Sequence, residues 1–205
     1  MSWRSRVWQK TEEFREKHLT GELAKLPIDV FTILELELEL DLIPFEGLYE
    51  KYQIDAAIRS DFTGVYVDAE DFELLDYGPE FKLRRLRFSI AHELGHLVLH
   101  RDEFERNGFK DVEGFADWTR SLGGQKYQVE KEANEFAGRL LVPVDVLNQA
   151  FHAFESDADR NLAADWRFNE AIRSSAAERI AQRFQVNPPV IKTRFSREDI
   201  WPEDS

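Results

Sequence analysis

Cysteine is missing from the 205 residues of the chain. Its absence excludes disulfides, cysteine nucleophiles and thiolate metal ligands, so any bound metal must use histidine or carboxylate side chains. Long apolar runs are missing as well. The first ten residues, MSWRSRVWQK, have no apolar core of signal-peptide length, and no segment is long enough to span a membrane. These absences predict a cytoplasmic protein.

Basic residues are scarce relative to acidic ones. The chain has 27 Lys and Arg against 40 Asp and Glu, which gives a net charge of −13. Such a protein is repelled as a whole by nucleic acid and by anionic membranes, so direct binding to either is disfavoured. The charge is typical of a soluble surface and also suits a basic protein partner. Sixteen Phe and five Trp provide for a buried core.

Apolar periodicity predicts a mostly helical chain with a small sheet. The helices are expected at residues 3–18, 82–100, 129–141, 144–154 and 166–184, with a short helix after 185. Asp29 could cap a helix to about residue 36, followed by a strand ending near Pro44. A second strand is expected over residues 62–68. Residues 101–126 are polar and end in Gly123-Gly124, which predicts a loop-rich excursion that could act as a flap.

The most specific motif is the pentapeptide His92-Glu93-Leu94-Gly95-His96 within the second of these helices. Residues four apart lie one turn apart on the same face, so His92 and His96 can bind one zinc ion. Glu93 is adjacent to the first ligand, where its carboxylate can accept a proton from the attacking water. Gly95 leaves space for a neighbouring element. The motif predicts a zinc metallopeptidase with Glu93 as the general base.

Two histidines leave a third protein ligand to be found, and without cysteine it must be histidine or carboxylate. Glu130 opens the next strong helix and shares a face with Asn134, which could hydrogen-bond a ligating histidine. Glu130 is therefore the expected ligand. Glu132 points about 160° further round the helix and is the alternative. His100 continues the series, but lies a turn beyond reach, which favours a dipole-stabilised or supporting role.

The segments LRFSIAHELGHLVLH and EKEANEFAGRLLVP together resemble the ImmA/IrrE family of metallopeptidases. The resemblance extends more weakly over most of residues 26–197. It implies an α+β, gluzincin-like minimal metalloprotease fold, with a small sheet beside the metal helix and Glu130 as third ligand. It also implies a prokaryotic cytosolic enzyme that cleaves repressor-like DNA-binding proteins in transcription regulation and stress responses. Family members often carry an N-terminal helix-turn-helix domain, for which about 25 residues are too few.

We therefore expect an N-terminal helical segment at residues 1–25, the metallopeptidase domain at 26–145 and a C-terminal helical subdomain at 146–205. Residues 173–197 hold six Lys and Arg against one Glu. They scan as helix, turn, helix, with Lys192, Arg194 and Arg197 on the second helix. The favoured interpretation is a helical pair packed on the catalytic domain; the alternative is a recognition surface, for protein rather than DNA.

The favoured function is a zinc-dependent endopeptidase that binds its substrate along the strand at residues 62–68, which is expected to be an exposed edge of the sheet. Tyr66 and Tyr127 could assist at the oxyanion, although a core position is favoured for each. The alternative is a non-catalytic module with the same metal fold that binds a regulator or an antitoxin-like partner. The intact Glu93 argues against that alternative, since binding alone needs only ligands. A third possibility, DNA binding by residues 176–197, conflicts with the acidic charge.

Overall fold

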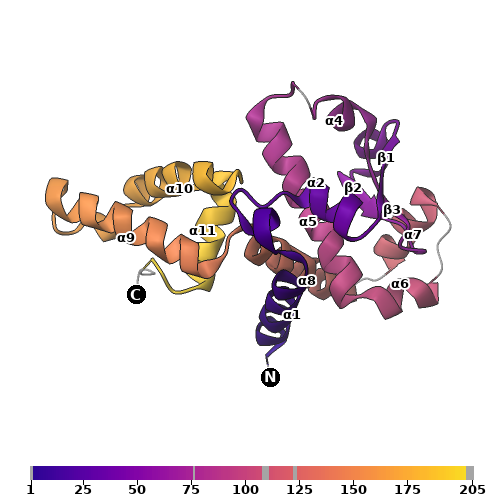
Figure 1. Cartoon of the computed structure of the whole chain (residues 1–205), viewed down its shortest axis with the longest axis horizontal. Coiled ribbons are helices and arrows are strands. Elements are labelled where there is room, and N and C mark those ends of the chain that lie inside the picture. The colour runs from indigo at the N-terminus through magenta and orange to yellow at the C-terminus, as the bar shows by residue number, and fades with distance from the viewer. Residues whose placement is uncertain (1, 76, 108–110, 122–123, 202–205) are drawn as a thin grey trace.

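The computed structural model describes residues 2–75, 77–107, 111–121 and 124–201, and helices dominate it (Figure 1). With one three-stranded sheet, the fold is α+β, as predicted. The sheet and its surroundings comprise α2 (Val30–Thr32), the π-helical η2 (Ile33–Glu37), β1 (Asp41–Phe45), α3 (Leu48–Tyr52), β2 (Ala56–Ile58), β3 (Gly64–Asp68) and α4 (Ala69–Glu73). The other elements are α1 (Trp3–His18), η1 (Gly21–Ala24), α5 (Glu80–Leu99), α6 (Arg101–Asn107), α7 (Val112–Ser121), α8 (Gly124–Leu141), α9 (Val144–Asn161), η3 (Trp166–Phe168), α10 (Glu170–Phe184) and α11 (Pro188–Arg197).

The sheet has the strand order β1-β3-β2, with β1 parallel and β2 antiparallel to β3. The strand predicted at residues 62–68 is therefore central, and the prediction that it forms an exposed edge is wrong. The edge strand that contacts α5 is β2, which the sequence analysis did not predict. Its three residues, Ala56, Ala57 and Ile58, are all buried, so β2 shows no alternation of apolar and polar side chains.

The helices α5 and α8 form the centre of the molecule. The predicted apolar stripe of α5 faces the core, with Leu86, Ile90 and Leu94 buried. At the crossing, a Cβ added to Gly95 would lie 3.0 Å from the Cα of Ala133 and 3.1 Å from its carbonyl oxygen. A side chain there would press on backbone, which would have to move by a few tenths of an ångström. Gly95 and the small, fully buried Ala133 and Ala137 allow the close approach expected from the sequence.

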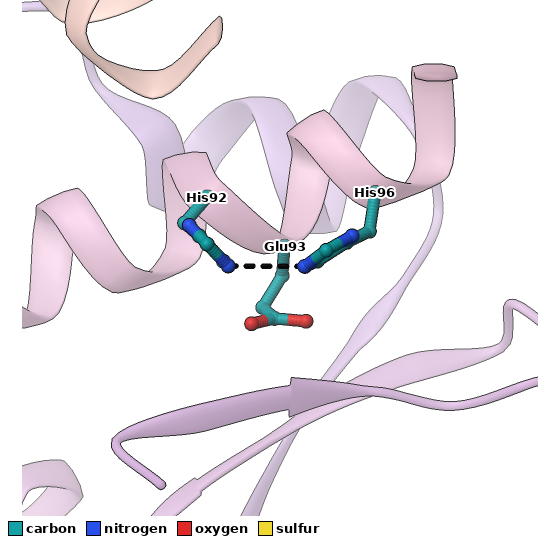
Figure 2. Close-up of side chains that lie close together, drawn as sticks. All are labelled: His92, Glu93 and His96. Atoms are coloured by element: carbon teal, nitrogen blue, oxygen red, sulfur yellow. Dashed lines mark hydrogen bonds between the residues drawn. The ribbon is translucent and has the colours of Figure 1, made fainter. Parts of the chain in front are cut away.

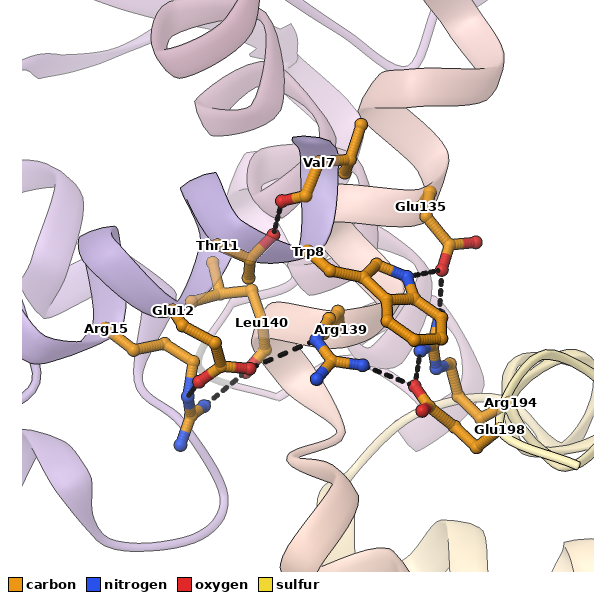
Figure 3. Close-up of polar contacts among 10 residues, drawn as sticks. All are labelled: Val7, Trp8, Thr11, Glu12, Arg15, Glu135, Arg139, Leu140, Arg194 and Glu198. Carbon is orange, nitrogen blue, oxygen red and sulfur yellow. Dashed lines mark hydrogen bonds and ion pairs between the residues drawn. The ribbon is translucent and has the colours of Figure 1, made fainter. Parts of the chain in front are cut away.

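The helices α9, α10 and α11 lie together on the side of α8 that faces away from the sheet (Figure 1). A network of charged and polar side chains joins α8 to α11 and to α1 (Figure 3). The carboxylate of Glu135 accepts from Trp8 Nε1 at 2.6 Å and from Arg194 Nη1 at 2.7 Å. Arg139 donates to Glu198 at 2.7 Å and to Glu12 at 3.0 Å. Arg194 is buried, so its charge is compensated inside the protein.

The basic side chains of α11 bear on the possible recognition helix. Arg194 pairs with Glu135, Lys192 Nζ lies 2.8 Å from a Glu170 oxygen, and Arg197 Nε lies 3.6 Å from Glu135. Each of the three residues proposed for recognition thus contacts an acidic residue of the same chain. This arrangement supports the interpretation as a packed helical pair. The two prolines at residues 188 and 189 are accommodated in the first turn of α11.

Residues 101–126 differ from the predicted loop-rich excursion, because α6, α7 and the first turn of α8 occupy most of them. Residues 108–110 and 122–123 lie outside the described residues. The helices form because Phe104, Val112 and Phe115 are buried, and the rings of Phe104 and Phe115 lie 6.1 Å apart. Three widely spaced apolar side chains in a polar stretch are a weak sequence signal, but suffice for short helices with a core to pack on.

The segment at residues 29–45 agrees more closely with its prediction. Asp29 caps α2, accepting from the backbone N–H groups of Phe31 and Thr32 at 3.1 Å each. The helical region continues through η2, and β1 follows at Asp41 rather than directly after residue 36. None of the helices in the described part of the chain is long and apolar enough to cross a membrane.

The α5–α8 crossing predicts a sharp contrast between two glycines. Gly95→Ala should lower the free energy of unfolding by about 1–3 kcal/mol, because the methyl group meets backbone. Gly138→Ala on α8 is the matched control, since its Cβ would lie 3.4 Å from the Arg194 side chain, an ordinary contact. The control should be neutral or stabilising by up to about 1 kcal/mol. Urea unfolding measures both; equal stabilities would contradict the close approach.

Candidate metal centre

His92 and His96, both on α5, point their Nε2 atoms toward one another (Figure 2). The Nε2 atoms of His92 and His96 lie 3.0 Å apart. The Glu130 carboxylate from α8 lies 3.2 Å from His92 Nε2 and 4.0 Å from His96 Nε2. A tetrahedral zinc with bonds of about 2.0 Å separates two ligand nitrogens by roughly 3.3 Å. The structure thus brings the two predicted histidines and the predicted glutamate to one point.

The protonation of the rings bears on whether a metal fits. His92 Nδ1 lies 3.1 Å from the side-chain oxygen of Asn134, which accepts the Nδ1 proton, so Nε2 is the nitrogen that would bind a metal. Asn134 thus lies where the sequence analysis expected it. Burial keeps the pKa of His96 well below its usual value, so this ring is neutral. Without a metal, the burial of His92 is outweighed by the carboxylates of Glu130 and Glu93, which raise its pKa. A metal ion would take the place of the Nε2 proton, and two imidazole nitrogens with a carboxylate are a donor set that fits zinc.

Three glutamates lie near these histidines, and their contacts differ. Glu93 also has an oxygen within 4.8 Å of the histidine nitrogens, so distance alone would admit it as a ligand. However, Glu93 Oε2 accepts the backbone N–H of Ile58 at 2.8 Å, which holds it against β2. Glu132, the alternative third ligand, is turned away and contacts His100 at 3.3 Å. Glu130 is the carboxylate whose position suits the third ligand.

Glu93 lies below the two histidines, between α5 and the sheet (Figure 2), and is only 3% exposed. Burial raises the pKa of Glu93 to about 7, although the charge of His92 and the Ile58 N–H act in the opposite direction. The negative charge of Glu130 adds to the increase. A carboxylate with a pKa near 7 is suited to accept and return a proton at neutral pH.

A cavity of about 350 Å³ opens onto these side chains. Residues before and in β2 (Gln53–Ala56), two residues of α5 (Phe88 and Ser89) and Phe115 of α7 line it with the residues of the metal centre. A second cavity, of about 450 Å³, shares Phe88, Glu130 and Asn134 with the first and continues between α8 and α11. A peptide could therefore reach the histidines along a connected surface.

Comparison with protein families matches residues 61–196, about two thirds of the chain, to the IrrE N-terminal-like domain of the Peptidase M78 family. The chain belongs to this family. The match supports a metallopeptidase and confirms the ImmA/IrrE resemblance. A search of curated proteins finds no match.

Some residues of this M78 site were not foreseen from the sequence. Ile58 acts through its backbone N–H, which carries no sequence signal, and β2 is too short to be recognised by alternation. Phe88 and Phe115 line the cavity, but in the sequence nothing distinguishes them from aromatic residues of the core. Tyr66, one possible oxyanion group, is half-buried on the central strand, with its ring 5.9 Å from that of Phe45. Tyr127 is 71% exposed and lines the second cavity, so its expected core position is wrong.

The contacts of the glutamates predict different metal affinities for two variants. Glu130→Gln should weaken zinc binding by more than about 100-fold, because it removes the carboxylate that faces both histidines. Glu132→Gln should still bind one equivalent at saturating zinc, with a loss of no more than about 100-fold. Competition with a chromogenic chelator measures both dissociation constants. The reverse order would identify Glu132 as the ligand.

The raised pKa of Glu93 predicts that the metal-free protein becomes less stable as the pH rises. Its pKa rises from 4.5 to about 7 on folding, so folding favours the protonated form. This stabilising contribution is complete below pH 4.5 and lost as the pH rises through 7. The free energy of unfolding of Glu93→Gln, relative to that of the wild type, should therefore increase by roughly 2–3 kcal/mol from pH 5 to pH 8.

Urea unfolding in chelator at pH 5 and pH 8 measures this difference. Glu50→Gln, which changes an exposed glutamate of α3, is the matched control and should follow the wild type at both values. An equal gain for Glu93→Gln at both pH values would show that burial does not disfavour the charged carboxylate.

Proposed function

We propose that the protein is a zinc-dependent endopeptidase of the cytoplasm that cleaves a protein substrate. The observation that carries the proposal is the position of Glu93, a buried carboxylate held beside two histidine nitrogens that face one another. A site that only bound metal, or only bound a partner, would not need a buried carboxylate whose charged form is disfavoured by its surroundings. Its position suits proton transfer.

The chemistry follows from the parts of the site. Zinc in such a site lowers the pKa of a water molecule toward ~7 and polarises a carbonyl group. His92, His96 and Glu130 would hold the ion. Glu93 accepts a proton from the attacking water and returns it to the leaving amine, which is the role for which its pKa is suited. The N–H of Ile58 fixes one carboxylate oxygen, so the other oxygen is left for the proton.

The shape of the cavity suggests how a peptide would bind. The segment Gln53–Ala56 leads into β2 and forms one wall, while α7 contributes Phe115. An extended peptide in this cavity would lie beside β2, the sheet edge next to α5, and not beside β3 as first expected. The second cavity, toward α11, could hold residues of the substrate further from the scissile bond.

The substrate class rests on the family resemblance, in which repressor-like DNA-binding proteins are the typical targets. The acidic charge of this chain supports that choice, since DNA-binding proteins carry basic surfaces. Cleavage of such a regulator would relieve repression. A non-catalytic module that binds the same kind of regulator is the alternative to be tested against it.

Activity of the zinc-loaded protein tests the proposal. The wild type is incubated with a peptide library made from a bacterial proteome, and new termini are identified by mass spectrometry. We expect zinc-dependent cleavage that falls by a factor of about 10² to 10⁴ in Glu93→Gln, because the general base is lost. Glu50→Gln is the control with the same change of charge and should retain full activity.

Regulators are then assayed directly. Purified helix-turn-helix repressors are incubated with the wild type and with Glu93→Gln, and cleavage is followed by intact mass. Cleavage by the wild type alone supports the proposed substrate class. If library peptides are cleaved but no repressor is, the result would contradict the substrate class and leave the peptidase activity supported. Repressor binding without cleavage, by a protein that holds one zinc, would establish the non-catalytic alternative.

A further inference from the structure

A chain of side chains leads from the ligand His96 to the N-terminal helix. His96 Nδ1 lies 3.1 Å from His100 Nδ1, and His100 Nε2 lies 3.3 Å from Glu132 Oε2. Glu132 in turn forms an ion pair with Arg6 of α1. The contacts connect three elements, α5, α8 and α1. The metal histidine is therefore linked, through one histidine and one carboxylate, to a residue 90 positions earlier in the chain.

The directions of these hydrogen bonds follow from which nitrogen of each ring carries the proton. If His96 binds metal through Nε2, its ring proton must be on Nδ1, and it donates to His100 Nδ1. His100 then carries its own proton on Nε2 and donates it to the Glu132 carboxylate, which only accepts. Each group has one consistent role. Glu132 thus selects the tautomer of His100, and His100 selects the tautomer of His96.

Most of this series of side chains is enclosed in the protein, whereas the side chain of Arg6 is 53% exposed. His96 and His100 are 1% and 5% exposed, and the Glu132 side chain is 5% exposed. A carboxylate buried in this way must be compensated by charged or hydrogen-bonding partners. Arg6 supplies the charge, and Gln128 Nε2 donates to the second oxygen at 2.7 Å. Water does not easily replace the buried contact between His100 and Glu132, so its loss should be transmitted to His96. Water reaches the exposed Arg6 more easily, so the loss of Arg6 should have a smaller effect.

We propose that His100 is a positioning residue for the metal ligand His96, and that helix α1 is part of the metal site through Arg6 and Glu132. The inference rests on the metal centre of the proposed function. It goes further because α1, at Trp3–His18, lies outside the residues 61–196 that match the family. The N-terminal helix would accordingly set metal affinity in addition to covering the core.

A purely structural role for α1 is the competing explanation, since α1 also contacts α8 away from this chain. Arg15 Nη1 donates to the carbonyl oxygen of Leu140 at 3.0 Å, one end of the network in Figure 3. Arg15 and Arg6 are therefore matched: both are arginines of α1 that bond to α8. They differ in that the side chain of Arg6 reaches Glu132 and that of Arg15 does not.

Zinc affinity by chelator competition, on the full chain, tests the proposal. Arg6→Met should weaken binding by roughly 3- to 10-fold and Glu132→Gln by roughly 10-fold, within the range for groups that orient a ligand. Arg15→Met should match the wild type within about 2-fold. Urea unfolding of the two arginine variants shows whether any difference in affinity follows stability. Equal zinc affinities for Arg6→Met and Arg15→Met would overturn the role of α1.

His100 is tested with a pair of replacements. His100→Phe removes the acceptor for His96 Nδ1–H and should weaken zinc binding by about 10- to 100-fold. His100→Asn offers a carbonyl oxygen near the same place and should recover most of the affinity. Nitrogen-15 NMR of the metal-free protein should show the Nδ1–H tautomer of His96 in the wild type and its loss in His100→Phe.

Wild-type affinity and an unchanged tautomer in His100→Phe would overturn the positioning role. None of these readouts needs peptidase activity. A wild type that binds no zinc would contradict the proposed function together with this inference, whereas zinc binding that is insensitive to all the variants contradicts the inference alone.

Discussion

The close crossing of α5 and α8 is the constraint on which the site depends. The two backbones approach at Gly95 and Ala133, where there is room for no larger side chain. The histidines are on one helix and the carboxylate that faces them is on the other, so the distance between the helices sets the distance between Glu130 and the Nε2 atoms. The candidate metal site would keep its geometry because its three side chains all belong to two packed helices and none belongs to a loop.

Helix α8 presents three carboxylates in three directions, and the helical period explains how they serve different ends. Glu130 faces the histidines, Glu132 faces His100 and Arg6, and Glu135 faces Trp8 and Arg194. Residues two apart point about 160° apart around a helix, and residues five apart about 140°. One helix thus anchors α11 and also holds the carboxylates that we propose to bind metal beside α5 and to support a ligand through α1.

Local spacing made much of this predictable. The i, i+4 histidines, Glu93 and the shared face of Glu130 and Asn134 follow from the helical period, which the sequence displays directly. Sequence alone left Glu130 and Glu132 as alternatives, because both are charged residues at the start of one helix. What separates them is the partner of Glu132, and Arg6 is 126 residues away. The position of β2 was missed for a similar reason: three apolar residues become a strand only by pairing with β3.

The distribution of charge on the protein bears on where a basic substrate would bind. The C-terminal region is rich in Lys and Arg, yet these side chains contact acidic residues of the same chain. Lys192 contacts Glu170, Arg194 contacts Glu135 and Glu198, and Arg197 contacts Glu135. Because the charges of these basic side chains are compensated, α11 repels a basic partner less than its composition suggests. The net charge of −13 then acts over the rest of the surface. If the proposed substrate is a DNA-binding protein, its basic DNA-binding surface would be attracted to this acidic protein, so we expect that surface to face it when the two meet.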